Sequence, residues 1–199
     1  KRLALVGDSI ASGIVMLGVL GHVGRRFDNI GQIEIVAPFA TLRGLARRII
    51  HRRNIRGTAW TESSETGERL LCVAGDAPHI NRRIHDYLKR EARRDIEAAV
   101  QHHAAAIGVK YKRITIRDQS SRWGSCSSNK TLSFSWRLIL TPPYVLDYIV
   151  AHEVAHLVEL NHSARFWRLV DKMCDQVERA KLWLDVHGND LHRYGASDE

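Results

Sequence analysis

Three histidines and one glutamate late in the chain have the types and the spacing of a metal-dependent hydrolytic centre. They are His152, Glu153, His156 and His162. If the segment is helical, His152 and His156 lie one turn apart on the same face, where both can bind one divalent ion. Catalytic zinc typically has three protein ligands and an open fourth position for water, so His162 is the predicted third ligand. Glu153 is the predicted general base, which takes a proton from a water whose pKa the metal lowers.

The third ligand has an alternative in Glu159, which lies one turn beyond His156. We prefer His162, because a loop histidine can approach the ion from the side, whereas Glu159 continues the helical row and points away along it. The spacing from His152 to His162 equals that of the metzincin pattern HExxHxxGxxH, but Glu159 stands where that pattern has glycine. The chain should therefore leave the helix in another way, and one Zn²⁺ ion per chain is expected.

The residues around the two helical histidines predict a helix that crosses the interior of a domain. Thr141 is the expected N-cap, and Pro142 and Pro143 fall in the first turn, where a missing N–H costs little. Apolar residues then follow around much of the circumference: Val145, Leu146, Ile149, Val150, Val154, Leu157 and Val158. The alternative is a core helix with two hydrogen-bonded histidines and an accidental glutamate.

The composition fits one intracellular domain with a small appendage. The chain has 199 residues, of which 44% are hydrophobic, and this suffices for a proper core. Its three cysteines, Cys72, Cys126 and Cys174, are odd in number and form no CxxC pair, so we expect no disulfide framework and a cytoplasmic location. The apolar run at residues 10–20 is too short to span a bilayer, and no membrane association is expected. Asp8 before this run argues against a signal peptide.

Positive charge is concentrated in the first two thirds of the chain. The net charge is +8, yet only 6 of the 30 Lys and Arg residues follow residue 139, against 10 of the 22 Asp and Glu residues. Two clusters carry much of the excess: Arg43, Arg47, Arg48, Arg52, Arg53 and Arg56, and then Arg82, Arg83, Lys89, Arg90, Arg93 and Arg94. Such clusters can bind phosphate backbones by releasing counterions, so nucleic acid is a candidate partner. Solvated surface is the simpler interpretation, because no recognised nucleic-acid module accompanies the charge.

We predict two regions, residues 1–75 and residues 76–199. The first is strand-rich, because short alternating apolar stretches follow residue 33, although the architecture of its opening 36 residues is not predicted. The second begins with a long helix that ends at Gly108.

Further elements are expected on either side of the histidine helix. In residues 131–140 apolar and polar side chains alternate, which predicts a half-buried strand with a polar opposite face. After the histidines, Ser163 can cap another helix, whose Phe166 and Trp167 turn inward. The apolar pattern then continues to Gly188, which suits the C′ position of a final helix.

Three stretches are more specific than the histidine spacing alone: residues 117–126 (RDQSSRWGSC), residues 135–140 (SWRLIL) and residues 152–167. Together they resemble the YgjP-type metallopeptidase family, which is similar to the SprT-like and WLM zinc proteases, and the similarity extends from about residue 38 to residue 195. The resemblance implies a zincin-like α+β fold, in which a small antiparallel sheet packs on a buried HExxH helix beside further helices. It also implies a zinc ion held by His152, His156 and His162, with Glu153 as catalytic base.

The resemblance says less about the substrate. SprT-like and WLM relatives act on proteins crosslinked to DNA, and the family implies peptide hydrolysis in general. Arg122, Trp123 and Arg137 are candidates for the wall of a substrate cleft, with residues 131–140 offering an edge to an extended peptide. The same residues can equally belong to a hairpin packed on the metal helix. Cys126 is either a ligand that keeps the zinc latent or, by preference, a buried structural thiol.

Two classes of function therefore remain. One is a zinc-dependent peptidase that acts on peptide or protein substrates. The other is a nucleic-acid-associated binding module with a structural or catalytically silent zinc site. Glu153 favours the enzyme, because a structural zinc site needs no carboxylate there and usually closes the fourth position with another protein ligand.

Overall fold

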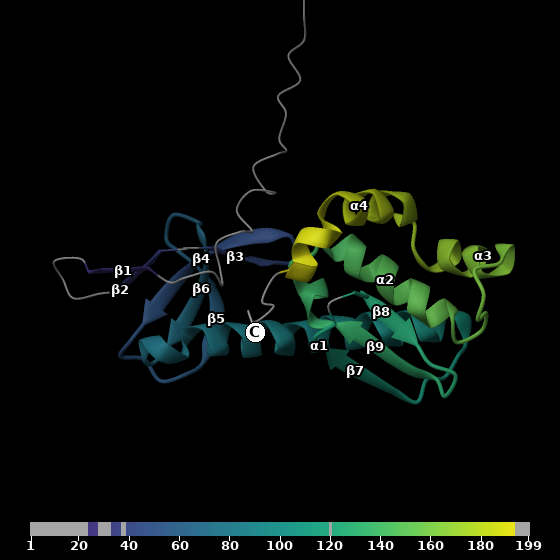
Figure 1. Cartoon of the computed structure of the whole chain (residues 1–199), viewed down its shortest axis with the longest axis horizontal. Helices are drawn as coiled ribbons and strands as arrows, with labels where there is room; N and C mark the ends of the chain where they lie inside the picture. The colour runs from purple at the N-terminus through teal and green to yellow at the C-terminus, as the bar shows by residue number, and fades with distance from the viewer. Residues whose placement is uncertain (1–23, 28–32, 37–38, 120, 194–199) are drawn as a thin grey trace, which may run out of the picture.

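The described residues form two main β-sheets near opposite ends of one long helix. The computed structural model describes residues 24–27, 33–36, 39–119 and 121–193. Helix α1 (Ile80–Ile107) runs along most of the length of the molecule (Figure 1). A four-stranded sheet lies at its N-terminal end, and a three-stranded sheet with three further helices lies at its C-terminal end. The expected class, helices combined with small sheets, is confirmed.

The N-terminal sheet has the strand order β3-β4-β6-β5. Its strands are β3 (Phe39–Leu42), β4 (Leu45–Arg52), β5 (Ala59–Ser63) and β6 (Arg69–Ala74). β4 and β6 run parallel, and the two outer pairs are antiparallel. The predicted strands after residue 33 are thus confirmed, while the division of the chain at residue 75 stays a prediction.

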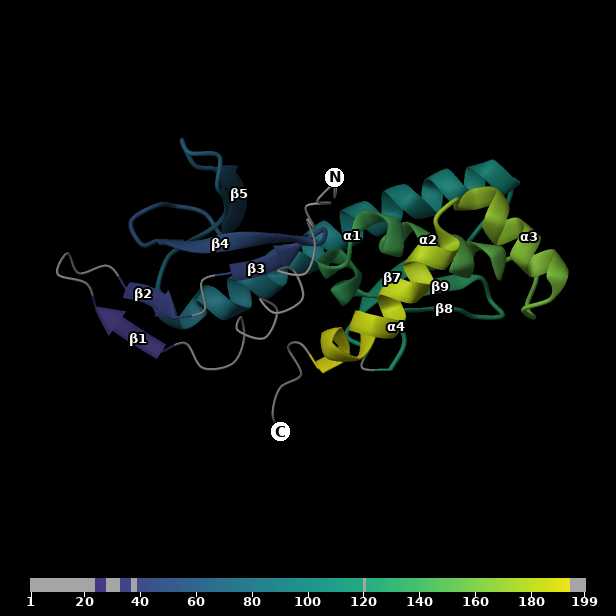
Figure 2. The ribbon, with the colours of Figure 1, turned by 90° about the horizontal axis from the view of Figure 1, so that it is seen from above.

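The first 36 residues contribute one described pair of strands. β1 (Gly24–Phe27) and β2 (Ile33–Val36) pair in antiparallel fashion beside the four-stranded sheet (Figure 2). The apolar run at residues 10–20 lies outside the described residues. Within the described part of the chain, the helices are too short or too polar to cross a membrane.

Helix α1 behaves as its sequence predicts. A 3₁₀ turn, η2 (Ala77–His79), leads into it, and it ends at Gly108, whose φ of 69° is the left-handed conformation that glycine adopts without strain. Its apolar stripe, which includes Ile84, Leu88, Ile96 and Val100, is fully buried. The helix therefore serves as the common support of both ends of the molecule.

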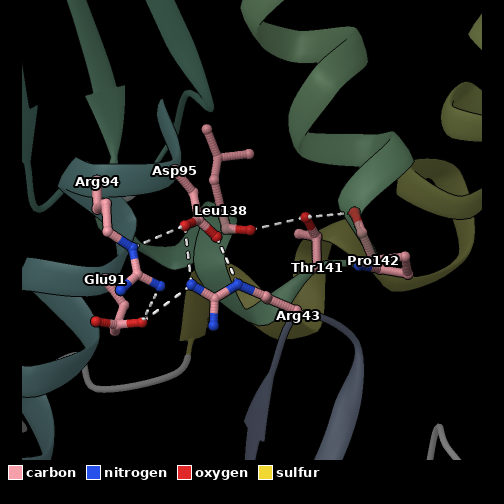
Figure 3. Close-up of polar contacts among 7 residues, drawn as sticks. All are labelled: Arg43, Glu91, Arg94, Asp95, Leu138, Thr141 and Pro142. Atoms are coloured by element: carbon pink, nitrogen blue, oxygen red, sulfur yellow. Dashed lines mark hydrogen bonds and ion pairs between the residues drawn. The ribbon is translucent and has the colours of Figure 1, made fainter. Parts of the chain in front are cut away.

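Arg43 fastens the N-terminal sheet to the rest of the domain (Figure 3). It lies in the turn between β3 and β4, and its backbone N–H donates to the Ile139 carbonyl at 2.7 Å. Its guanidinium donates to Asp95 at 2.6 and 2.8 Å and to Glu91 at 3.0 Å, both on α1. Because these charges are partly buried and paired, they hold the turn in one position on the helix. Arg43, a member of the first basic cluster, therefore has a structural role.

The C-terminal sheet has the strand order β7-β9-β8. Its strands are β7 (Arg113–Arg117), β8 (Gly124–Cys126) and β9 (Thr131–Ser135). β9 runs parallel to β7 and antiparallel to β8, so the sheet is mixed where a purely antiparallel one was expected. Strand β8 comes between β7 and β9 in the sequence, but in the sheet β9 lies between β7 and β8. β8 therefore lies at an edge of this sheet.

The predicted strand at residues 131–140 is wrong in its second half. β9 ends at Ser135, and the 3₁₀ helix η3 (Trp136–Leu140) follows. The Ser135 hydroxyl accepts a hydrogen bond from the backbone N–H of Arg137 at 3.3 Å, which caps the turn and stops the strand. All ten side chains are buried, so no polar face is exposed to solvent. Some of the polar residues in this stretch form buried hydrogen bonds, such as that between Ser133 and Thr115 at 2.8 Å.

Three helices complete the domain: α2 (Pro143–Ala155), α3 (Ala164–Met173) and α4 (Val177–Arg193). Ser163 caps α3 as predicted, since its hydroxyl accepts from the N–H of Phe166 at 3.3 Å. Gly188 does not end a helix but lies inside α4. A Cβ built at Gly188 would meet the Trp123 indole at 3.7 Å, so this glycine packs α4 beside Trp123. All three cysteines are free thiols, as expected.

Candidate metal centre

Helix α2 begins at the second of two adjacent prolines and is buried on most sides. Pro142 is its N-cap residue, and the Pro142 carbonyl accepts from the N–H of Val145 at 2.9 Å. The predicted cap, Thr141, is wrong, because its hydroxyl donates back to the Leu138 carbonyl of η3 at 2.8 Å. The helix contacts α1, α3, α4 and β8. The segment that carries the histidine motif is thus an interior helix, in agreement with its apolar sequence.

The three histidines of the motif converge at the C-terminal end of α2. His152 lies in its last turn, His156 is its C-cap residue with helical angles (φ −64°, ψ −14°), and His162 lies just before α3. Their candidate ligand atoms all lie within 4.8 Å of one another. Nε2 of His152 and Nε2 of His162 are 3.1 Å apart. Three converging imidazole nitrogens are a donor set that suits a divalent ion such as zinc.

Two of these imidazoles are held in the neutral state that metal binding requires. Burial, with smaller contributions from the other two histidines and from Lys181, lowers the pKa of His152 to about 4. Burial also lowers the pKa of His156. Nδ1 of His156 donates to the carbonyl of Glu159 at 2.9 Å, which orients the ring and leaves Nε2 as its free ligand atom.

Glu159, the alternative third ligand, is engaged elsewhere. Its carboxylate pairs with Arg165 at 3.0 Å, and its carbonyl accepts from His156. Its side chain does not belong to the group of converging ligand atoms in the described residues. This arrangement supports His162 over Glu159, although the ligand set itself stays a prediction.

Glu153 extends from α2 toward strand β8. A Cβ built at Gly124 would lie 2.6 Å from Cγ of Glu153 and 2.8 Å from Oε1, so the close approach of strand and helix depends on glycine. Glu153 is only 7% exposed, and burial raises its pKa to about 7. A carboxyl group whose pKa lies near neutrality is well matched to accepting and releasing a proton.

Two aromatic residues of α3 surround the histidines. The ring of Phe166 is fully buried, and its centroid lies 4.9, 4.5 and 4.8 Å from those of His152, His156 and His162. The ring of Trp167 lies 6.0 Å from His152 and 5.9 Å from His162, and it is partly exposed. The sequence predicts that both turn inward, but its helical periodicity does not reveal that Phe166 contacts all three imidazoles.

Most of the chain matches a known family of metallopeptidase domains. Residues 36–187 match the model of the YgjP-like metallopeptidase domain. The chain belongs to the YgjP-like metallopeptidase family. The resemblance seen in the sequence is therefore confirmed, and the family implies a hydrolase that uses a divalent metal.

Comparison with solved structures and curated proteins adds little to the YgjP-like assignment. The crystal structure of the metallopeptidase zymogen abylysin from Pyrococcus abyssi is 27% identical and covers 46% of this chain and 90% of that chain, with a TM-score of 0.40. No curated protein matches the chain.

The predicted substrate-contacting residues of this YgjP-like domain lie in different environments. Arg122 is exposed and Trp123 is half-buried, and both precede the edge strand β8. Arg137 is 2% exposed, pairs with Asp118 and lies over the ring of Trp136 at 5.0 Å. Its burial favours a structural role for Arg137, whereas Arg122 and Trp123 remain candidates for contact with substrate.

The edge that an extended peptide needs is also placed differently from the sequence-based expectation. β9 is the central strand and is paired on both sides, so residues 131–140 offer no free edge. β8, which the sequence analysis did not recognise as a strand, has that position beside Glu153. The sequence feature that could have indicated this strand is the glycine within Trp-Gly-Ser-Cys, because glycine in a strand often marks a close approach to another element.

Cys126 ends the edge strand and is partly exposed. Burial, and then the charge of Glu153, raises the pKa of its thiol, which disfavours the thiolate that binds zinc. The thiol is not among the converging ligand atoms in the described residues. These observations favour a structural thiol over a latency ligand.

Several arginines of the two basic clusters are paired with carboxylates. The pairs are Arg48 with Glu68, Arg52 with Glu62, Arg93 with Glu97, and Arg43 and Arg94 with Glu91 and Asp95. Pairing reduces the positive charge that these side chains can offer to phosphates. Contact with nucleic acid stays a prediction.

Proposed function

We propose that the chain is a zinc-dependent peptidase that binds one Zn²⁺ ion through His152, His156 and His162. Glu153 is its general base, and its substrates are peptides or proteins. The observation that carries the proposal is the convergence of three imidazoles beside a buried glutamate whose pKa lies near neutrality. Membership of the YgjP-like metallopeptidase family supports the same class of reaction.

Each residue of the centre has a distinct task in this proposal. A divalent ion polarises a peptide carbonyl and lowers the pKa of a water molecule. Glu153 takes a proton from the attacking water and passes it to the leaving amine, a transfer for which a pKa of about 7 is suited. The carbonyl of Glu159 orients His156, and the ring of Phe166 excludes water from the inner side of the imidazoles.

The edge strand β8 is the proposed guide for the substrate. An extended peptide can add to an exposed sheet edge through main-chain hydrogen bonds, and β8 is unpaired on one side within the described residues. Gly124 on this strand lies against Glu153, so a peptide paired with β8 runs past the general base. Arg122 and Trp123 precede the strand and are placed to contact the same peptide.

Substitution Glu153→Gln tests the proposal. The amide keeps the shape of the side chain but has almost no basicity, so cleavage of an unfolded protein should fall by a factor on the order of 10² to 10⁴. Zinc content and melting temperature should stay near wild type, because the histidines are unchanged. Undiminished cleavage by the variant contradicts the mechanism. Loss of zinc would instead place Glu153 among the ligands.

A further inference from the structure

Lys181 of α4 is held beside the candidate metal centre. Its Nζ lies 4.3 Å from the centroid of the Trp167 ring, and that ring contacts the imidazoles of His152 and His162 at 6.0 and 5.9 Å. Helix α4 contacts α2 (Figure 1), and its Lys181 lies over the ring of Trp167 on α3. A single indole ring therefore separates a positive charge from two of the three proposed ligands.

The ammonium group of Lys181 is accessible and only loosely paired. The side chain is 35% exposed and donates to Glu178 at 2.8 Å, on the same face of α4. The side chain of Glu178 is 81% exposed, and ion pairs in such solvated positions contribute little stability. Attraction to the face of Trp167 keeps the ammonium in place when Glu178 moves away. Lys181 can therefore exchange Glu178 for another carboxylate.

Two other charged groups near the centre are already paired or buried. A second cation, Arg165 on the neighbouring helix α3, is already paired with Glu159 at 3.0 Å. Glu153 lies where α2 meets β8 and is buried. A substrate carboxylate beside Trp167 would therefore lie close to the charge of Lys181.

We propose that Lys181 is a specificity-determining residue that binds a carboxylate of the substrate close to the scissile bond. The carboxylate belongs either to an aspartate or glutamate side chain or to the C-terminus of the peptide. The proposal rests on the proposed peptidase function. An extended peptide advances about 3.3 Å per residue, so a carboxylate within roughly three residues of the bond is in reach.

Peptide binding to the zinc-loaded Glu153→Gln protein tests this inference without depending on turnover. Calorimetric titration would compare peptides that differ by Glu against Gln at one position, and by a free acid against an amide at the C-terminus. Lys181→Gln should weaken binding of the preferred acidic peptide by about three- to tenfold and leave the neutral peptide unchanged. Glu178→Gln should strengthen the same binding, because it removes the competing carboxylate.

Lys172→Gln is the matched control, since Lys172 is exposed on α3 and undergoes the same change of charge. It should leave every peptide affinity near its starting value. The peptide that loses affinity in Lys181→Gln identifies the source of the carboxylate. Loss confined to the free-acid peptide assigns the C-terminus, and loss confined to the peptide with an internal glutamate assigns the side chain. Equal loss for acidic and neutral peptides, no loss, or no binding of acidic peptides to the zinc-loaded protein would overturn the inference.

The same experiment distinguishes this inference from the proposed function. If acidic peptides bind through Lys181 but wild-type protein cleaves none of them, the peptidase proposal fails and the carboxylate site stands. If wild-type protein cleaves peptides without regard to their charge and Lys181→Gln changes nothing, the peptidase proposal stands and the carboxylate site fails.

Discussion

Gly124 of strand β8 lies directly against the side chain of Glu153 on α2. A methyl group at Gly124 would come within 2.6 Å of Cγ and 2.8 Å of Oε1, which no ordinary contact permits. Because α2 is packed on several sides and β8 is held by β9, Glu153 has little room to retreat. The position of the proposed general base is thus possible only because the neighbouring strand has no side chain at Gly124.

Substitution Gly124→Ala should therefore impair catalysis more than metal binding. The added methyl group displaces the Glu153 carboxylate, and misplacement of a catalytic group by about 1 Å can cost on the order of 10² in rate. The three atoms nearest to the new methyl group all belong to Glu153 and none to a histidine, so zinc content should be retained. Cleavage rate and zinc stoichiometry, measured on the same preparation, check this expectation.

Gly188→Ala provides the control for a glycine that needs no such space. A Cβ there would meet Trp123 at 3.7 Å, an ordinary contact, and the residue lies within helix α4, where alanine is favoured. This variant should keep its cleavage rate and melt at the same or a higher temperature. If both alanine variants lose activity equally, the contact between Gly124 and Glu153 is not what positions the base.

The sequence predicted the elements whose signals are local. The histidine spacing, the helix-ending Gly108 and the capping Ser163 each depend on residues within one or two turns, and the structure places each in the expected element. Thr141 and Gly188 have equally good local signals but lie elsewhere. A 3₁₀ turn engages the hydroxyl of Thr141, and helix α4 continues through Gly188, which lies beside Trp123.

The parts of the site that depend on long-range packing were not predictable from one sequence. Strand β8 has three residues, too few for a periodic pattern, and its place at the sheet edge follows from the insertion of β9 between β7 and β8. Phe166 reads as an ordinary core residue of α3, because helical periodicity shows that a side chain is buried without showing what it contacts. The edge position of β8 and the contacts of Phe166 both depend on tertiary packing.

The ligand assignment predicts opposite effects of two alanine substitutions. His162→Ala should reduce zinc affinity strongly, because it removes one of three converging nitrogens. Glu159→Ala should keep zinc at nearly full stoichiometry, since the residue orients His156 through its backbone carbonyl, which the substitution leaves in place. Zinc content after dialysis against a chelator checks both. Retention by the first variant with loss by the second would reverse the assignment.

Zinc should also stabilise the folded chain. An ion that binds only the native state raises the free energy of unfolding by about 2.7 kcal/mol at one hundred times its dissociation constant. A chelator should therefore lower the melting temperature of wild-type protein but not that of His162→Ala. Differential scanning fluorimetry with and without the chelator makes the comparison. A chelator effect of equal size in both proteins would show that the stabilising ion is bound elsewhere.

Any binding of nucleic acid should be weak and sensitive to salt. Much of the arginine charge in the two clusters is neutralised by paired carboxylates, which leaves exposed residues such as Arg53, Arg56 and Arg82 to contact phosphates. Each neutralised phosphate releases counterions, so affinity should fall steeply as salt rises. Substitution of these three arginines by glutamine should abolish binding measured at low salt. Binding that survives both high salt and the three substitutions would show that it does not depend on these charges.

Phe166→Ala should weaken metal binding even though Phe166 offers no ligand atom. Its fully buried ring lies within 4.9 Å of all three imidazole centroids, so its removal frees each ring to rotate away from the shared centre. Loss of a group that orients metal ligands typically costs about 10- to 100-fold in affinity. Val170→Ala, one turn further along α3 and equally buried, is the control for a cavity that leaves the rings in place. Competition with a chromogenic zinc chelator gives both affinities, and circular dichroism establishes that both variants are folded. Equal zinc affinities in the two folded variants would limit Phe166 to a role in core packing.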